Sequence, residues 1–341
     1  MAYSRKNFLK LTGLSAFAIL GGAGKSLNSS ENSSKSLIKP NRISRTSTIG
    51  LIAPASPVYN KSDFDEMLIT LKNQGYTLKL GKHVRDRRGF LAGTDKDRAA
   101  DLMSMFKDSN VDAILCVRGG WGCNRILDFI DFDVIKNNPK PLIGFSDITT
   151  LHMSIAAKTG LVSFHGPVGT SDWNEFTQAS FDNVLINGVP EEYKVPEEDL
   201  YNAYTIRSGK ATGPIYGGNL TVLTAMIGSD YLPDFRGSIL FLEDVGESVY
   251  RIDRMLTQLK LAGVLDDISG FIFGQCTDCK GGENSLTLNQ ILDDHIKPLG
   301  IPAYYGAMIS HEAKNVTIPV GMNAEMDANS MSFSINQSSV I

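Results

Sequence analysis

The chain has 341 residues, of which 42% are hydrophobic and 21% are charged, and this composition is typical of a globular protein long enough for two domains. Its net charge is −4 and it has no basic stripe, so nucleic acid is not an expected partner. Beyond the first residues no apolar run is long enough to span a membrane, so we expect no membrane contact apart from an N-terminal leader.

The N-terminus has the three parts of a signal peptide. Arg5, Lys6 and Lys10 lie at or near the start of an apolar run at 8–23, and a polar stretch rich in Ser and Asn follows. We predict a signal peptide over residues 1–26 and a polar linker over 27–46. Arg5-Lys6 resembles a twin-arginine export motif with lysine in the second place. We therefore expect an exported, periplasmic protein, with the twin-arginine and the general secretion routes both open.

The next part of the chain, residues 47–170, alternates short apolar runs with amphipathic segments. The apolar runs predict strands at 47–55, 76–80, 111–117, 142–143 and 161–164. The amphipathic segments predict helices at 61–73, 96–106, 123–130 and 148–158. This order is typical of an α/β domain with a doubly wound, mostly parallel sheet, in which functional sites lie beyond the carboxyl ends of the strands.

One strand end in this domain has the pattern of a nucleophile elbow. An apolar run ends at Gly144 and a helical pattern begins almost at once, with Ser146 on the turn between them. In such a turn the serine hydroxyl projects from the sheet edge, and the N–H of Asp147 faces a developing oxyanion at the positive end of the helix. The alternative is that Ser146 only caps the helix, because Ile148 replaces the second glycine of G-x-S-x-G.

The remaining chain is predicted to form a connection and a second domain. Residues 171–207 look irregular, with two prolines and an Asn-Gly pair, and suit an interdomain connection. Residues 208–341 are predicted to form a β-rich C-terminal domain. We expect helices at 220–227, 250–261 and 286–295, strands at 238–242 and 270–273, and antiparallel strands over 315–341.

A nucleophilic serine needs a histidine to accept its proton, and the chain has five histidines. His311 lies in a polar loop, and His165 ends a predicted strand at the functional edge of the sheet, so both stay open as the base. His152 is expected to be a half-buried helix residue, and His83 and His295 are expected at the surface.

The base in turn needs a carboxylate that fixes its tautomer. Glu243 follows the apolar run at 239–242, and Asp244 and Glu247 are its local competitors. The structural alternative is that one of these acids pairs with Arg251 or Arg254.

The spacing of the cysteines does not indicate a metal-binding site. Cys276 and Cys279 form a single C-x-x-C pair without a second pair or a histidine pair beside it. We therefore predict no metal site, and we expect a local disulfide or free thiols at these positions.

Seven motifs in order resemble the LD-carboxypeptidases, the muramoyltetrapeptide carboxypeptidase family of serine peptidases. The resemblance covers the chain from about Thr48 to Gly321. The motifs are Val117-Arg118-Gly119-Gly120-Trp121-Gly122, Leu142-Ile143-Gly144-Phe145-Ser146-Asp147, His165-Gly166-Pro167, Gly217-Gly218-Asn219-Leu220, Leu242-Glu243-Asp244-Val245, Tyr250-Arg251-Ile252-Asp253-Arg254-Met255-Leu256 and the loop from His311 to Gly321.

The resemblance implies a Ser-Glu-His triad in this chain order. Carried over by motif, the nucleophile is Ser146, the carboxylate is Glu243 and the base is His311. The fold implied is an N-terminal α/β domain and a β-rich C-terminal domain with the site between them. Dimers are common in the family, so a homodimer is possible.

The same resemblance implies how the substrate is held. The oxyanion donors would be the N–H of Asp147 and an N–H of Gly119 or Gly120. Arg118 could bind the terminal carboxylate of the substrate, since a guanidinium suits that group, or it could fasten the turn to the sheet. Trp121 stands where many relatives have Tyr, and we group it with the substrate-binding residues.

The activity implied is removal of the terminal D-alanine from peptidoglycan tetrapeptides through an acyl-enzyme, without a cofactor. The third stem residue, diaminopimelate or lysine, stays open. One alternative is a microcin-C-type self-immunity peptidase, for which Trp121 or Trp173 could stack on a base. The other is a non-catalytic cell-wall peptide-binding protein, which the intact triad disfavours.

Overall fold

The structure, a computed structural model, describes residues 36–341. The predicted signal peptide lies outside the described residues. The end of the predicted linker lies inside them and packs on the folded body: Ile43 is buried, and its N–H donates to the carbonyl of Leu185. Residues 38–43 therefore belong to the folded unit and are not a free linker. Within 36–341, no helix has the length and apolar character that crossing a membrane requires.

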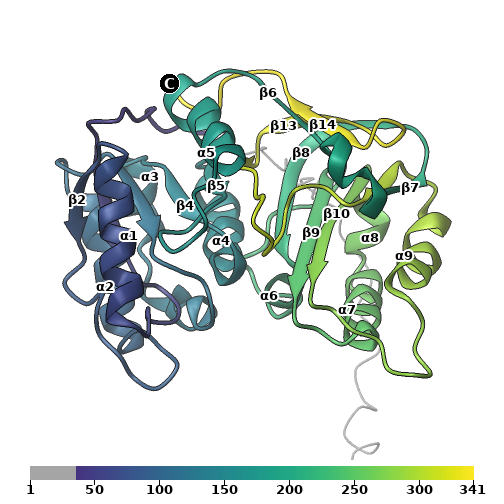
Figure 1. Cartoon of the computed structure of the whole chain (residues 1–341), viewed down its shortest axis with the longest axis horizontal. Helices are drawn as coiled ribbons and strands as arrows, with labels where there is room; N and C mark the ends of the chain where they lie inside the picture. The colour runs from purple at the N-terminus through teal and green to yellow at the C-terminus, as the bar shows by residue number, and fades with distance from the viewer. Residues whose placement is uncertain (1–35) are drawn as a thin grey trace, which may run out of the picture. The chain divides into compact units, whose positions relative to one another are not determined.

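The first sheet has six strands, in the order β12-β5-β4-β3-β1-β2. Five of them are parallel, as predicted, and the sixth, β12, is antiparallel and comes from near the C-terminus. The strands are β1 (Thr48–Ile52), β2 (Thr77–Leu80), β3 (Ala113–Cys116), β4 (Leu142–Gly144), β5 (Ser163–His165) and β12 (Ile318–Val320). The helices around this sheet are α1 (Lys61–Asn73), α2 (Asp95–Lys107), α3 (Phe132–Asn137) and α4 (Thr149–Thr159). The mostly parallel α/β architecture predicted for this part is confirmed (Figure 1).

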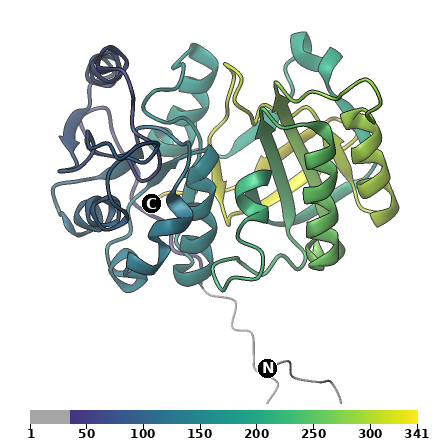
Figure 2. The ribbon, with the colours of Figure 1, turned by 90° about the horizontal axis from the view of Figure 1, so that it is seen from below.

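The second sheet has eight strands, in the order β6-β14-β13-β8-β9-β10-β11-β7. Its centre, β8 to β11, is parallel, and β6, β7, β13 and β14 are antiparallel to their neighbours. The strands are β6 (Glu191–Lys194), β7 (Tyr204–Arg207), β8 (Lys210–Asn219), β9 (Ile239–Val245), β10 (Gly270–Thr277), β11 (Ala303–Tyr305), β13 (Asn323–Asp327) and β14 (Ser332–Ile335). The helices of this part are α6 (Leu220–Thr224), α7 (Val249–Leu261), α8 (Val264–Asp267) and α9 (Leu288–Ile296). Figure 2 shows α7 and α9 beside the parallel strands.

The prediction of an irregular connection over 171–207 was wrong. This segment contains α5 (Glu175–Asp182), β6 and β7, and the two strands form the opposite edges of the second sheet. Both edge strands are short and largely polar, so they lack the apolar alternation by which a strand is recognised in a sequence. The disulfide between Cys276 and Cys279, one of the two expected alternatives, is present at the end of β10.

The C-terminal part of the chain returns to the first sheet beside the predicted elbow. β12 pairs with β5, which pairs with β4, so Ile318 lies opposite His165 and His165 lies opposite Gly144. The polar loop that contains His311 runs directly into β12. On the other side, α4 packs against β8 and α6 of the second sheet. These contacts bring the turn at Ser146 next to residues from the far half of the chain.

Candidate active site

Ser146 has a strained backbone. It follows β4 by two residues and has a φ of 64°, in the left-handed region that L-residues other than Asn and Asp rarely adopt. Among the described residues only Asp278 and Met331 share a positive φ without being glycine. The left-handed conformation costs roughly 1–2 kcal/mol, and such strain clusters at functional sites. A residue that only caps a helix has an extended backbone instead, so the geometry favours the elbow interpretation.

The glycine turn after β3 lies directly against Ser146. A Cβ added to Gly119 would stand 2.7 Å from the Cβ of Ser146 and 3.0 Å from its Oγ, so only glycine allows this approach. Within the described chain, the N–H groups of Gly119 and Gly120 donate to no other backbone group. Donors without a protein partner are therefore present beside the serine hydroxyl.

Asp147 turns its side chain away from the solvent. The carboxylate is buried and accepts the N–H of Cys123 at 2.7 Å. Burial raises the pKa of this carboxyl above its ordinary value. The side chain thus ties the elbow to the segment after the glycine turn and does not line the cavity beside Ser146.

Glu243 and His311 form a hydrogen-bonded pair. His311 Nδ1 lies 2.8 Å from Glu243 Oε2, and Glu243 is fully buried within β9. Burial alone would lower the pKa of His311, but the hydrogen bond and negative charge of Glu243, with smaller contributions from Asp244 and Glu312, outweigh it and raise the pKa. With Nδ1–H donated to the carboxylate, Nε2 is left to accept a proton.

The carboxylate of Glu243 is itself fixed by neighbours. Its Oε1 accepts from Asn219 Nδ2 at 3.2 Å, and the same amide donates to Asp244 at 3.1 Å. Asp244 instead accepts hydrogen bonds from the N–H and the hydroxyl of Thr221. Its pKa is raised to about 6, mainly because the carboxyl is buried and to a lesser extent because Glu243 is negatively charged. Of the three acids considered from the sequence, Glu243 is the one in contact with a histidine.

His165, the other histidine considered as the base, lies elsewhere. It is fully buried against Phe145 and Phe241, and neither ring nitrogen has a hydrogen-bond partner among the described residues. Burial holds its pKa well below the ordinary value. It does not line the cavity that contains Ser146, so the geometry does not support His165 as the base.

His152 is fully buried, not half-buried as expected. Its Nε2 lies 2.7 Å from the carbonyl of Gly144 and its Nδ1 lies 2.8 Å from the hydroxyl of Ser163. Burial lowers its pKa to about 4, so the ring is neutral at neutral pH. A neutral ring that donates at Nε2 and accepts at Nδ1 satisfies both contacts. These two contacts of His152, which support the turn that carries Ser146, were not predicted from the sequence.

A cavity of about 500 Å³ is lined by several of the predicted site residues, although Asp147, Glu243 and Trp121 are not among them. Its wall includes Ser146, His311, the glycine turn and Arg118. The rest of the wall is formed by Phe145, Val168, Thr170, Ser171, Asp172, Thr177, Val245, Glu312, Ala313 and Asn315. No hydrogen bond joins Ser146 to His311 among the described residues, and such contacts often tighten only when a substrate is bound.

Arg118 also faces a second cavity, of about 620 Å³, which shares the segment 170–172 with the first. The guanidinium donates to the carbonyl of Pro57 at 3.3 Å and lies 5.4 Å from the ring centre of Tyr59. It has no carboxylate partner among the described residues, so its charge is available to an anion. Trp173 lines this second cavity, whereas Trp121 lines neither and is 45% exposed.

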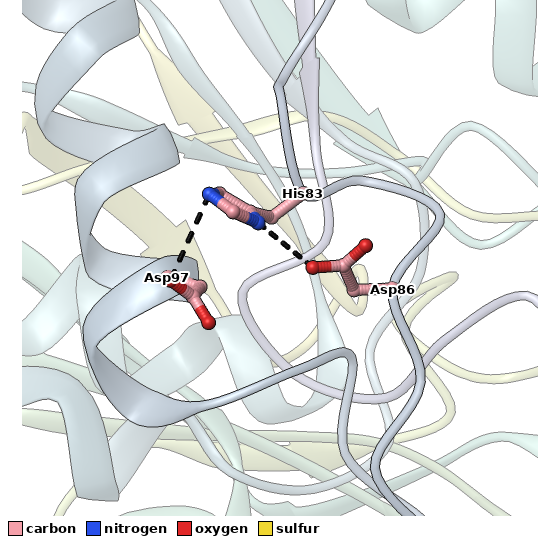
Figure 3. A group of neighbouring side chains, drawn as sticks. All are labelled: His83, Asp86 and Asp97. Carbon is pink, nitrogen blue, oxygen red and sulfur yellow. Dashed lines mark hydrogen bonds and ion pairs between the residues drawn. The ribbon is translucent and has the colours of Figure 1, made fainter.

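A separate group of titratable side chains lies on the loop after β2 and at the start of α2 (Figure 3). The two ring nitrogens of His83 face different carboxylates, Asp86 at 2.7 Å and Asp97 at 3.7 Å. Asp97 is also bound by the hydroxyl of Thr94, which caps α2. These contacts hold the loop against the helix.

Comparison with known proteins gives the family. The model of the LD-carboxypeptidase N-terminal domain matches residues 49–166, and the model of the LD-carboxypeptidase C-terminal domain matches residues 212–326. A probable murein peptide carboxypeptidase of Bacillus subtilis is 41% identical over 297 residues, which cover 85% of this chain and 91% of that protein.

Solved structures agree with these matches. The microcin C7 self-immunity protein MccF in its apo state is similar with a TM-score of 0.83 and 29% identity, over 89% of this chain and all of that one. The muramoyltetrapeptide carboxypeptidase of Oxalobacter formigenes is similar with a TM-score of 0.75 and 30% identity, over 84% of this chain and 97% of that one. The chain therefore belongs to the LD-carboxypeptidase family and is a serine-type carboxypeptidase.

Proposed function

We propose that the protein removes the terminal D-alanine from peptidoglycan tetrapeptides, with Ser146 as nucleophile, His311 as base and Glu243 as the carboxylate that orients it. The observation that carries this proposal is the Glu243–His311 hydrogen bond at a cavity that also contains the strained Ser146. Named relatives add support, since they include a murein tetrapeptide carboxypeptidase of Pseudomonas aeruginosa, 33% identical to this chain.

The reaction proceeds through an acyl-enzyme. Ser146 Oγ attacks the carbonyl carbon of the third stem residue as its proton moves to Nε2 of His311. The N–H groups of Asp147 and of Gly119 or Gly120 stabilise the oxyanion. Collapse of this intermediate breaks the C–N bond, and the departing amine of D-alanine takes the proton from His311. A water molecule then attacks the ester, His311 takes its proton and returns it to Ser146, and the tripeptide leaves with a free carboxylate.

Arg118 binds the terminal carboxylate of the substrate in this scheme. It lines the same cavity as Ser146 and carries a charge that no acidic side chain of the described residues neutralises. A guanidinium can bind a carboxylate through two parallel hydrogen bonds, which also orients it. Loss of this contact is expected to raise KM for peptides with a free C-terminus.

The test is the release of alanine from defined tetrapeptides, one with diaminopimelate and one with lysine at the third position, followed by mass spectrometry. The wild type should remove one alanine from at least one of them, and Ser146→Ala should remove none. Ser330→Ala, which changes an exposed serine on the turn between β13 and β14, is the matched control and should be fully active. Alanine release by Ser146→Ala at the wild-type rate would end the proposal.

Trp173 favours a second candidate function. Its ring lines the cavity next to the one that contains Ser146, where it could stack on a nucleobase, and MccF has a similar fold. A peptide–nucleotide conjugate of the microcin C type would then be cleaved by the same residues. Cleavage of such a conjugate in preference to both tetrapeptides would support this second function.

We also propose that the protein is exported, on the basis of the leader that begins with Arg5-Lys6. Export would place it with its peptidoglycan substrate. Cell fractionation of the full chain, compared with a variant that lacks residues 1–26, tests this for either export route, because the variant should remain in the cytoplasm. A homodimer is the quaternary state to test by light scattering.

A further inference from the structure

Asn315 has a side chain that the reaction scheme does not use. The residue is 4% exposed, and neither Oδ1 nor Nδ2 of its carboxamide has a hydrogen-bond partner in the described part of the chain. Yet Asn315 lines the same cavity as Ser146 and His311. Of the buried side chains without a partner between residues 36 and 341, it alone lines this cavity; His165 and Thr317, for instance, do not.

The backbone around Asn315 is held in place. The N–H of Asn315 donates to the hydroxyl of Thr177 at 3.3 Å, and the next N–H, of Val316, donates to the carbonyl of Met308 at 3.0 Å. The carbonyl of Ala313 accepts from Asn174 at 2.7 Å and from Thr177 at 3.2 Å. The backbone that carries this carboxamide is therefore fixed at the wall of the cavity.

A buried carboxamide without partners is unfavourable for the free protein. Native proteins pair nearly all of their buried polar groups, and the exceptions are concentrated at functional sites. Asn was not needed to fill this position, because an apolar side chain of similar size would leave no unpaired group. A partner that arrives with the substrate accounts for the residue.

The chemistry of that partner follows from the two free atoms. Nδ2 donates and Oδ1 accepts, so the matching ligand offers one acceptor and one donor on the same side. A peptide main chain does so through the N–H of one amide and the C=O of another, because the two groups of a single trans amide point in opposite directions. A carboxylate only accepts and would leave Oδ1 unpaired. In a tetrapeptide the residue that leaves carries no amide beyond the scissile one, so the nearest other amide is the one before the third residue.

We propose that Asn315 is a specificity-determining residue for the main chain of the stem peptide, with Oδ1 accepting the N–H of the amide that precedes the third stem residue and Nδ2–H donating to the carbonyl of a neighbouring amide. The inference rests on the proposed function, because it takes a stem peptide as the ligand. It explains how the enzyme selects a peptide on the acyl side of the cleaved bond, while Arg118 holds the leaving residue.

The test compares two substrates and three variants. The substrates are the tetrapeptide that the wild type cleaves and an analogue in which the amide before the third residue is an ester, which lacks the N–H. Asn315→Leu removes both polar atoms, Asn315→Asp keeps the shape and loses the donor, and Asn187→Leu is the control at an exposed position. kcat/KM and the thermal midpoint are measured for each protein.

For the tetrapeptide, we expect kcat/KM to fall roughly 10- to 100-fold in both Asn315 variants and to be unchanged in the control. The wild type should cleave the ester analogue about 10-fold less well than the tetrapeptide, and Asn315→Leu should show no such difference. The thermal midpoint of Asn315→Leu should be equal to or above that of the wild type, since an unpaired group has been removed.

Three results would overturn the inference. Unchanged kcat/KM in Asn315→Leu would show that the residue does not bind the substrate. An equal loss on both substrates together with a lower thermal midpoint would show a structural role. Failure of the wild type to release alanine from either tetrapeptide would overturn the proposed function and this inference together, whereas in the first two cases the proposed function stands.

Discussion

The imidazole of His152 binds the carbonyl of Gly144, two residues before the serine at the strained turn. Nε2 of His152 lies 2.7 Å from that oxygen, and Nδ1 is bound by Ser163 on the neighbouring strand. The ring thus ties the first turn of α4 to the end of β4 and the start of β5. Because the turn at Ser146 is held against its backbone preference, this contact should help to fix the nucleophile.

Replacing His152 is therefore expected to affect both stability and turnover. His152→Leu should lower the free energy of unfolding by about 1–3 kcal/mol, since it leaves the hydroxyl of Ser163 unpaired in the core. It should also lower kcat, by up to about 100-fold for a displacement near 1 Å, with little change in KM. Denaturant unfolding and steady-state kinetics on the tetrapeptide measure the two effects.

The control for this prediction is His295→Leu, which removes a contact with Asp253 on α7, far along the chain from the elbow. It should leave kcat unchanged. His152→Gln keeps a donor and should recover part of the lost activity. A His152→Leu enzyme with wild-type kcat would show that the ring only fills space.

The second prediction concerns the pH dependence of the reaction. As base, His311 must be neutral in the free enzyme, so kcat/KM should rise with pH through the pKa of His311. The hydrogen bond and charge of Glu243 outweigh the effect of burial and raise that pKa, so the midpoint of this rise should lie above the ordinary value of 6.5. Glu243→Gln should move the midpoint to lower pH and lower kcat by roughly 10³- to 10⁴-fold.

The same shift has a consequence for stability. Because the pKa of His311 is raised by folding, its pairing with Glu243 stabilises the protein fully below the unfolded value near 6.5, and this contribution is lost as pH rises through the folded pKa. Glu243→Gln should remove this dependence, whereas Glu325→Gln, at an exposed position of β13, should leave both the kinetic and the stability profile as they are. An unshifted kinetic midpoint in Glu243→Gln would contradict the assigned pair.

The local elements of the first half of the chain could be predicted because their signals are local. The helix predicted at 61–73 is observed at those residues, and the apolar runs became the parallel strands β1 to β5. The turn at Ser146 was also visible, since a strand that leads into a helix leaves few conformations for the residue between them.

The parts that could not be predicted depend on contacts between distant segments. Nothing in the sequence near His152 shows that its ring reaches the carbonyl of Gly144, because that depends on how α4 packs on β4. Likewise, Glu243 and His311 are 68 positions apart, and their pairing depends on how the loop before β12 meets β9. The choice between His311 and His165 needed the resemblance to a family, since both end up near the same sheet edge.

The third prediction tests the glycine turn. Gly119→Ala places a Cβ 2.7 Å from that of Ser146, so either the serine or the turn must move. A displaced turn no longer directs its N–H groups at the oxyanion, and we expect kcat to fall on the order of 10²- to 10³-fold, as when an oxyanion donor is lost. The measurement is kcat for tetrapeptide cleavage, together with the extent of labelling of Ser146 by a fluorophosphonate.

Gly282→Ala is the control, because a Cβ at that glycine meets nothing within 4 Å. It should have wild-type kcat. If Gly119→Ala were as active as Gly282→Ala, the turn would have no part in catalysis and the close approach to Ser146 would be a matter of packing alone.

The last prediction uses the strain at Ser146. In ordinary helix positions Ala is more stable than Gly by about 1 kcal/mol, because Gly loses more backbone freedom on folding. At a φ of 64° the order should reverse, since Ala keeps the Cβ that makes this conformation unfavourable and Gly does not. We therefore expect Ser146→Gly to be more stable than Ser146→Ala by roughly 0.5–1 kcal/mol, measured by denaturant unfolding, although neither can form the acyl-enzyme.

Ser104, which is exposed in α2, provides the matched pair of variants for comparison. At that position Ser104→Ala should be more stable than Ser104→Gly. If the Ala variant were more stable than the Gly variant at both positions, Ser146 would not be strained in solution, and the elbow interpretation would lose its main physical support.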